Sequence, residues 1–235
     1  MKTTTILMLG MASLFFQACQ QEKPESNEIN KEVEEKTEVK VDSNALVFEN
    51  LDQILSPFED MTEYALNKND EGILKSLNKV EAASKENIFS KNLKDESIAS
   101  LNSKIEILKE LINKKDYEQI ALASTELFEY NTSNFIDTKK IENQIRIEHL
   151  DYMGFKILAL LNQKKIDWKN IEQTISNVEK EWIALNPNVK DGNLKDSFEL
   201  LFSGLHLSAQ NKDVKMGEIL ASMDLSLVDV LENSF

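Results

Sequence analysis

The chain has 235 residues, of which 27 are Lys or Arg and 41 are Asp or Glu, so its formal net charge is -14; 41% of its residues are hydrophobic. This composition is typical of globular proteins and excludes wholesale disorder and a fibrous repeat. The acidic excess opposes binding to the phosphates of DNA or RNA, and the small number of glycines and prolines, six and three, favours helices over a turn-rich β fold.

The first residues of the chain have the pattern of an export signal. Lys2 is followed by an apolar run from Ile6 to Phe16, and the small residue Ala18 precedes Cys19, the only cysteine in the sequence. As a helix, this run would be about 16 Å long, well short of the ~30 Å hydrocarbon core of a bilayer. We therefore predict a segment that engages the export machinery without spanning a membrane.

The four residues Phe16-Gln17-Ala18-Cys19 resemble the lipobox of bacterial lipoprotein precursors. Ala18 and Cys19 match the lipobox, whereas Phe16 and Gln17 depart from its commonest residues. The resemblance implies removal of a signal peptide, residues 1–18, and attachment of fatty acyl chains such as palmitate to Cys19. Because two or three acyl chains bind a membrane durably, it also implies a cell-envelope protein, anchored to a bacterial membrane with its body in the periplasm or on the outer surface. The alternative is an ordinary secretory signal with an incidental free cysteine.

Residues 19–45 predict an acidic, disordered tether between the anchor and the folded body. Within residues 20–44 there are eight acidic and four basic side chains but few aliphatic ones, and such a segment cannot form a core. A flexible coil of this length spans about 25 to 30 Å, which would hold the body beyond the lipid head groups. The alternative is a short helix within Glu28–Val39, where Glu and Lys side chains can pair.

From Leu46 onward, apolar residues recur at intervals of three and four, the spacing that places them on one face of an α-helix. Because an isolated amphipathic helix of this length is marginal in water, these faces need to pack against other helices. We therefore predict an all-α fold of about eight helices, at 46–68, 70–86, 94–113, 116–135, 139–164, 168–186, 193–211 and 213–233. The clearest apolar stripes are Ile98, Leu101, Ile105, Leu108 and Ile112; Trp168, Ile171, Ile175, Val178, Trp182 and Leu185; and Met216, Leu220, Met223, Leu227 and Val230.

Several of these helices have recognisable start signals. The sequence Ser-Pro-Phe-Glu at 56–59 has the pattern of a capping box with proline at the first helical position, which predicts a break or sharp kink near Pro57. Asn92 and Asn193 each begin the tetrapeptide Asn-Leu-Lys-Asp, and we expect each asparagine to cap the helix that follows it.

The second half of the chain resembles the first at a shift of 97 to 101 residues. Besides the repeated tetrapeptide, Leu-Ala-Ser at 122–124 aligns with Leu-Ala-Ser at 220–222. We therefore predict two tandem four-helix units, 46–137 and 138–235, with the function at the seam between them. The alternative is a chance alignment, because any two amphipathic helical stretches align at some shift.

The chain has two histidines, His149 and His206. Neither lies in the patterns of di-iron bundles or zinc proteases, and the sequence has no Gly-rich phosphate loop, nucleophile elbow or calcium loop. One alternative is a metal- or haem-carrying bundle, in which His206 pairs with Met61, Met153 or Met223. We favour partly exposed, structural positions for both histidines, and we predict no catalytic residue, no cofactor, no metal ligand and no enzymatic activity.

Four aromatic residues, Trp168, Trp182, Tyr152 and Phe155, are of the kind that lines a ligand groove. Trp168 and Trp182 lie about four helical turns apart, so they share one face of a helix. A core seam requires the same spacing, and we favour core packing over a groove.

These features favour a noncatalytic binding or docking module held in the bacterial envelope. Its expected partners are the membrane, through acylated Cys19, and an unknown envelope protein or small ligand, whereas nucleic acid is disfavoured by charge. The alternatives are the metal- or haem-carrying bundle and a structural spacer. A cluster of exposed apolar side chains would argue against the spacer, since such clusters mark contact surfaces.

Overall fold

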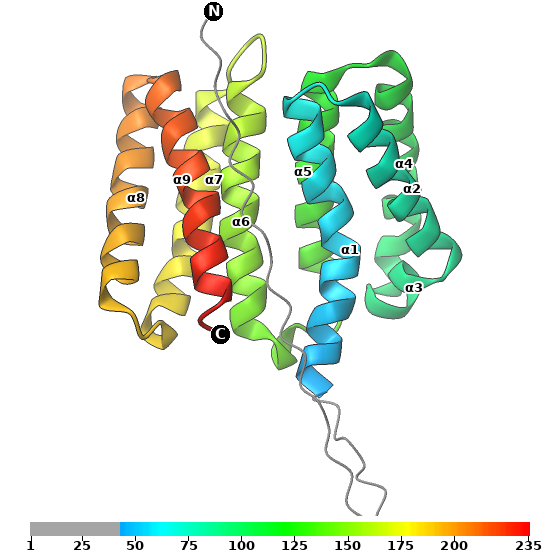
Figure 1. Ribbon diagram of the computed structural model, residues 1–235, viewed down its shortest axis with the longest axis horizontal. Helices are drawn as coiled ribbons and strands as arrows, with labels where there is room; N and C mark the ends of the chain where they lie inside the picture. Colours follow the sequence, from blue (N-terminus) through cyan, green and yellow to red (C-terminus); the bar gives the residue numbers. More distant parts are fainter. Residues whose placement is uncertain (1–42) are drawn as a thin grey trace, which may run out of the picture. The chain divides into compact units, whose positions relative to one another are not determined.

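The computed structural model describes residues 43–235, and within this range it is built of helices without a β-strand (Figure 1). An all-α fold with eight long helices is therefore confirmed. The signal peptide at 1–18, Cys19 and the tether as far as residue 42 lie outside the described residues. The helices are α1 (Ser43–Leu66), α2 (Asp70–Lys85), α3 (Ile88–Asn92), α4 (Asp95–Lys114), α5 (Tyr117–Asn134), α6 (Glu142–Leu161), α7 (Trp168–Leu185), α8 (Gly192–Asn211) and α9 (Val214–Glu232), with 3₁₀ turns at Thr138–Lys140 and Asn186–Asn188.

The predicted helices match the eight long ones to within a few residues, but the short helix α3 was not predicted. It follows Asn87, which has a left-handed backbone conformation with a φ of 60°, so the helical path of α2 does not continue into α3. Phe89 of α3 is buried in the core, and just beyond the helix the backbone of Leu93 pairs with that of Phe135 at the end of α5. Because these contacts join residues far apart in the sequence, no local periodicity reveals them.

Helix α1 runs without a break through Pro57, so the predicted break at this position is wrong. A proline inside a helix loses one backbone hydrogen bond and crowds the preceding turn, at a cost of about 3 kcal/mol. Packing offsets this cost, because Ile54, Leu55 and Phe58 around the proline are each at most 1% exposed. Burial of each such side chain stabilises the fold by about 1.5 to 3 kcal/mol. A break in the helix at Pro57 would expose part of this surface and lose part of that stabilisation.

The two copies of Asn-Leu-Lys-Asp do not cap helices as expected. The Asn92 side chain donates a hydrogen bond back to the Ile88 carbonyl, within α3. Helix α8 is capped by Asp191, whose carboxylate accepts hydrogen bonds from the backbone N–H groups of Asn193 and Leu194, so Asn193 lies inside the first turn. An aspartate is a good cap because its charge also complements the positive end of the helix. The tandem duplication stays a prediction.

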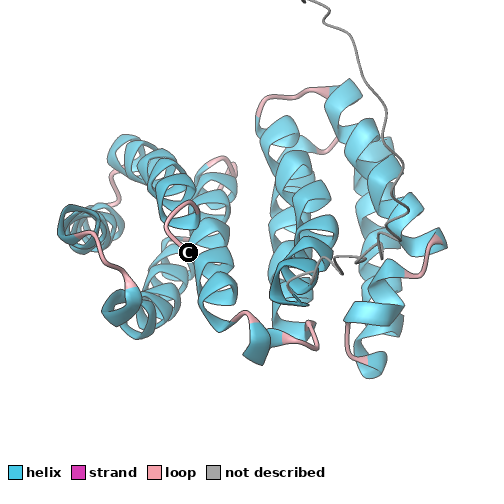
Figure 2. Cartoon of the chain, turned by 60° about the horizontal axis from the view of Figure 1, so that its bottom comes forward, coloured by secondary structure: helices cyan, strands magenta, loops and turns pink. Residues whose placement is uncertain are grey.

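Buried apolar side chains form two clusters, one centred on α1 to α5 and one on α6 to α9. Helix α6 joins them, because it packs on α1 and α5 as well as on α7 and α9 (Figures 1 and 2). Its Ala159 belongs to the first cluster, Met153 and Ile157 belong to the second, and Tyr152 packs against both. A helix with apolar residues on opposite faces is buried between two layers. As a result, α1, α6 and α9 meet at the seam between the clusters.

Candidate functional site

Helix α9 is apolar on two faces. In the predicted stripe, Leu220 and Leu227 pack partly buried against the second cluster, whereas Met223 and Val230 are exposed. The buried residues of α9 are Gly217, Ala221, Asp224, Val228 and Leu231. Met223 and Val230, which were expected inside, are 41% and 55% exposed, so this prediction is wrong. The small Gly217 explains the choice of face, because a Cβ there would lie 3.0 Å from the side chains of Leu161 on α6 and Ser208 on α8. Close approach of the three helices therefore turns the small-residue face inward.

The exposed apolar side chains of α9 continue onto α8. Leu200 and Leu207 of α8 are 71% and 48% exposed, and Ile219 of α9 is 59% exposed. The two helices pack side by side, with Leu220 of α9 over Gly204 of α8. Because Leu200 and Leu207 lie about one turn to either side of Gly204, they border the exposed residues of α9. We call the following five residues the α8–α9 face: Leu200, Leu207, Ile219, Met223 and Val230.

The α8–α9 face concentrates exposed apolar surface on a strongly charged protein. Five of the eleven large apolar side chains that are exposed in residues 43–235 belong to it. Helical spacing places Ser203, Ser226 and Leu227 between them, so no charged residue interrupts the face. Clustered exposed apolar side chains of this kind mark contact surfaces.

Trp182 of α7 is a core residue and does not line a groove. It is 1% exposed, and its ring stacks on Phe198 of α8 with the ring centroids 4.4 Å apart. Its indole Nε1–H donates a hydrogen bond of 3.0 Å to Glu199. Trp168 is partly buried at the edge of the same cluster. The Trp spacing therefore reflects core packing.

Tyr152 and Phe155 of α6 lie at the seam. Together with Glu59, Thr62, Thr125 and Phe128 they surround a void with no room for a water molecule. The two aromatic side chains thus fill space between helix layers around this void, in keeping with core packing rather than with the alternative of an aromatic groove.

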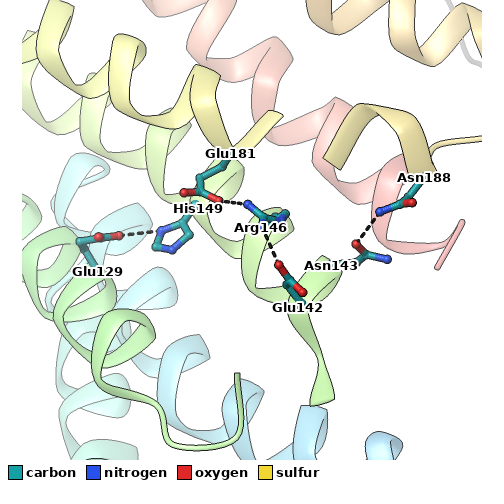
Figure 3. A network of polar contacts seen from close by, with 7 residues as sticks. All are labelled: Glu129, Glu142, Asn143, Arg146, His149, Glu181 and Asn188. Carbon is teal, nitrogen blue, oxygen red and sulfur yellow. Dashed lines mark hydrogen bonds and ion pairs between the residues drawn. The ribbon is translucent and has the colours of Figure 1, made fainter. Parts of the chain in front are cut away.

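His149 lies in a network of polar contacts that links three helices (Figure 3). Its Nδ1 is 3.0 Å from a carboxylate oxygen of Glu129 on α5. One turn earlier on α6, Arg146 donates hydrogen bonds to Glu142, at 2.7 Å, and to Glu181 of α7. Pairs of this kind near the surface contribute at most about 1 kcal/mol each, so the network orients helices more than it stabilises them.

His206 of α8 lies at the edge of the core, with Nε2 3.1 Å from a carboxylate oxygen of Glu179 on α7. The methionines named for the haem alternative lie in three different settings. Met61 and Met153 are fully buried in separate clusters, and Met223 is on the α8–α9 face. Within residues 43–235, no three His, Cys, Asp or Glu side chains form a group able to hold a metal ion.

Sequence reasoning missed a set of buried carboxylates where α1, α6 and α9 meet. Glu148 and Asp151 of α6 are 8% and 9% exposed, and Asp224 of α9 is fully buried. Among residues 43–235, neither carboxylate oxygen of Asp224 has a hydrogen-bond partner of good geometry. The sequence contained one signal for the burial of Asp224. This residue follows the small residues Gly217 and Ala221 at helical spacing, so it lies on the same face of α9.

Burial raises the pKa of these carboxylates. For Glu148 the main cause is burial, followed by repulsion from Glu232 and Glu59, and every charged group that acts on it is acidic. Burial, and then repulsion from Glu232, raises the pKa of Glu59 to about 7. For Asp224 burial alone raises the pKa, opposed by the nearby backbone of Gly154. Among the described residues, only acids act on Glu148 and Glu59, and burial gives the seam around them a low dielectric.

Comparison of the chain with known protein families, with curated proteins and with solved structures found no match. Within residues 43–235, no helix combines the length and apolar character needed to cross a bilayer. The function therefore has to be inferred from the residues described above.

Proposed function

We propose that this protein is a lipid-anchored protein of the bacterial envelope whose helical body is a noncatalytic docking module. The α8–α9 face carries this proposal, because it leaves five large apolar side chains exposed side by side. Completing the burial of one half-exposed Leu, Ile, Met or Val is worth about 1 kcal/mol. Five such contributions favour a partner, and a structural spacer would have no use for this surface.

The partner that we propose is an envelope protein with an apolar contact surface flanked by basic residues. Between Gly192 and Glu232 the chain has seven acidic and three basic residues, and the formal net charge of the whole chain is -14. Opposite charges speed the encounter of two proteins and select against like-charged partners. A second copy of this acidic chain and an anionic membrane surface are both disfavoured by the same repulsion.

We expect a variant carrying both Leu200→Glu and Ile219→Glu to lose its partner, because each change would bury an unpaired carboxylate in an apolar interface at a cost of several kcal/mol. The partner would first be captured from detergent-solubilised envelopes with the mature protein, and its affinity would then be measured with both components purified. The matched control carries Leu74→Glu and Ile107→Glu, at residues 52% and 57% exposed on α2 and α4.

The proposal requires a protein that binds the wild type and the control variant but not the α8–α9 variant, with an affinity that falls as salt is added. Equal binding by all three proteins would contradict it. Concentration-dependent self-association that only the α8–α9 variant loses would assign the face to a second copy. Vesicle binding that only this variant loses would assign it to the membrane, and either result would overturn the proposed partner.

We expect the native protein to begin at Cys19 and to carry two or three acyl chains, and we expect Cys19→Ser to abolish acylation and release the body from membranes. Intact mass of the native protein and of the variant checks this, together with their distribution between membrane and soluble fractions. A native product that still begins at Met1, or an unmodified Cys19, would refute the lipid anchor while leaving the docking experiment interpretable.

A further inference from the structure

A cavity of 540 Å³ opens at the seam, where the start of α1 meets the first turns of α6 and the end of α9. In Figure 1 the C-terminus lies near the first turn of α6, and α1 also begins at this end of the molecule. The lining combines two carboxylates, from Glu148 and Glu232, with the apolar side chains of Phe48, Ile147 and Phe235. Its volume lies within the range of about 300 to 1,000 Å³ that small-molecule sites occupy.

Glu148 is the residue that points to a ligand. It is 8% exposed, its side chain lines the cavity, and it has no hydrogen bond or ion pair with any described residue. A buried carboxylate is costly unless it receives hydrogen bonds or a paired cation. The described residues around Glu148 supply neither, and Glu148 lines the open cavity, where a ligand can supply them.

The charges around the cavity favour a cation. Glu232 on α9 lines the same cavity, and Asp52 and Glu59 of α1 act on Glu148 together with it. Asp151 lies one turn further along α6 and is itself buried. Acidic groups gathered in a low-dielectric cleft create a negative potential that raises the local concentration of cations.

We propose that this cavity binds a primary ammonium group carried on an apolar chain. The carboxylates of Glu148 and Glu232 accept hydrogen bonds from the ammonium, and the side chains of Phe48, Ile147 and Phe235 pack against the apolar chain. A primary ammonium has three N–H donors, enough to donate to both carboxylates at once, and each carboxylate has two oxygens that can accept. Aromatic faces add to the attraction for a cation.

The lining distinguishes this ligand from other cations. Calcium and magnesium require about six or more oxygen ligands, and within residues 43–235 no three His, Cys, Asp or Glu side chains form a group that could hold a metal ion. A quaternary ammonium has charge but no N–H to donate, so it would leave the oxygens of Glu148 without hydrogen bonds. A neutral alcohol fits the apolar part but leaves the carboxylates without a counter-charge. This inference does not depend on the α8–α9 face.

We expect hexylammonium to bind the unacylated Cys19→Ser chain at pH 8, measured by isothermal titration calorimetry. Hexanol and hexyltrimethylammonium, which share its alkyl chain, should bind at least about 10-fold more weakly, because they lack the charge or the donors. Glu148→Gln should lower the affinity for hexylammonium about 10- to 100-fold. Glu218→Gln is the matched control, since it removes one charge from an exposed position on α9, and it should leave the affinity unchanged.

The affinity should rise with pH as long as the ammonium stays protonated, because burial raises the pKa of Glu148 and this carboxyl therefore holds its proton at lower pH. The other groups that face Glu148 are Asp52 and Glu59 on α1 and Glu232 on α9, with Asp151 beside it on α6, and all are acids. Ionisation of these acids also raises the affinity for the ammonium as the pH increases. The rise should shrink in Glu148→Gln, which a purely structural role for Glu148 would not produce.

The ammonium can belong to a free amine or to the lysine of a peptide. A lysine tripeptide and its Nε-acetylated form separate these sources: tighter binding of the unmodified tripeptide than of hexylammonium assigns a protein lysine, and the reverse assigns a free amine. Equal binding of hexanol and hexylammonium, no binding at millimolar concentration, or an unchanged affinity in Glu148→Gln would overturn the proposal. Thermal unfolding of Glu148→Gln, expected at or above the wild-type temperature, shows that this variant is folded.

Discussion

Replacing Asp224 with asparagine should raise the free energy of unfolding at pH 8 by about 2 to 4 kcal/mol, with a smaller effect towards pH 4. Asp224 is fully buried on α9, and in the described part of the chain neither of its carboxylate oxygens has a hydrogen-bond partner of good geometry. At pH 8 the folded protein has either to bury this charge without compensation or to hold a proton that the unfolded chain releases. Asparagine has nearly the same shape and no charge, so it removes the ionic part of this cost.

The direction of the pH dependence follows from the raised pKa values at the seam. Unfolded Asp and Glu side chains ionise near pH 4. In the folded protein the pKa of Glu59 is about 7, and burial raises those of Glu148, Asp151 and Asp224 well above their ordinary values. The folded state therefore holds more protons, and the stability that these groups contribute is present below about pH 4 and lost as the pH rises through 7. We accordingly expect the wild type to be more stable at pH 5 than at pH 8.

Urea titrations at pH 5 and pH 8 measure this effect through the midpoint of unfolding at an unchanged m value. Glu218→Gln is the matched control, because it removes one negative charge from an exposed position on the same helix, and it should shift stability by less than about 0.5 kcal/mol. If the wild type were equally stable at both pH values, or if Asp224→Asn were less stable at pH 8, Asp224 would have to be compensated in the folded protein.

Trp182→Ala should lower the free energy of unfolding by about 3 to 5 kcal/mol, the range for truncation of a buried aromatic side chain. Trp182 is 1% exposed, stacks on Phe198 and donates a hydrogen bond to Glu199. Its removal would leave a cavity between α7 and α8, and the exposed Glu199 carboxylate would lose one donor. Chemical denaturation followed by far-UV circular dichroism measures the loss.

Two further variants separate the causes of this loss. Trp182→Phe keeps most of the aromatic packing and removes the hydrogen bond to Glu199, so it should cost about 1 to 2 kcal/mol. Trp168→Ala, on the same face of α7 but only partly buried, should cost clearly less than Trp182→Ala. If the two alanine variants lost similar amounts of stability, the buried Trp182 would contribute no more to the stability of the second cluster than the partly buried Trp168.

The helices were predictable because the features that define them are local. Leu101, Ile105 and Leu108 recur at helical spacing in the sequence and are buried in α4. The same holds in α7, where Ile171, Ile175, Val178, Trp182 and Leu185 are buried as predicted. Contacts three and four residues apart dominate these stripes, so a one-dimensional pattern contains enough information to place them.

Start signals were less reliable where tertiary contacts compete with them. The pattern around Pro57 has the residues of a helix start, yet buried neighbours on both sides keep α1 continuous. Asn193 has the chemistry of a cap, yet Asp191, two residues earlier, takes that position. A cap is worth about 1 kcal/mol, which is less than the packing of a helical turn into a core, and packing therefore prevails.

The candidate sites were the least predictable part of the molecule. Of the α8–α9 face, only Met223 and Val230 belong to a stripe that was expected in the core, and no sequence pattern indicated that Glu148 and Asp151 are buried. The lipid anchor at Cys19 stays a prediction, because it rests on residues outside the described range. Recognition of the sites required knowing which helices are neighbours in space.

The order of residues was sufficient to establish a helical protein, its eight long helices and their approximate ends, since helix formation depends on side chains a few positions apart. Packing between helices determined which of the two apolar faces of α9 is buried, and it brought the acids of α1, α6 and α9 together. The hydrophobic effect has no direction, so a helix with two apolar faces fits either way until the close approach at Gly217 selects one.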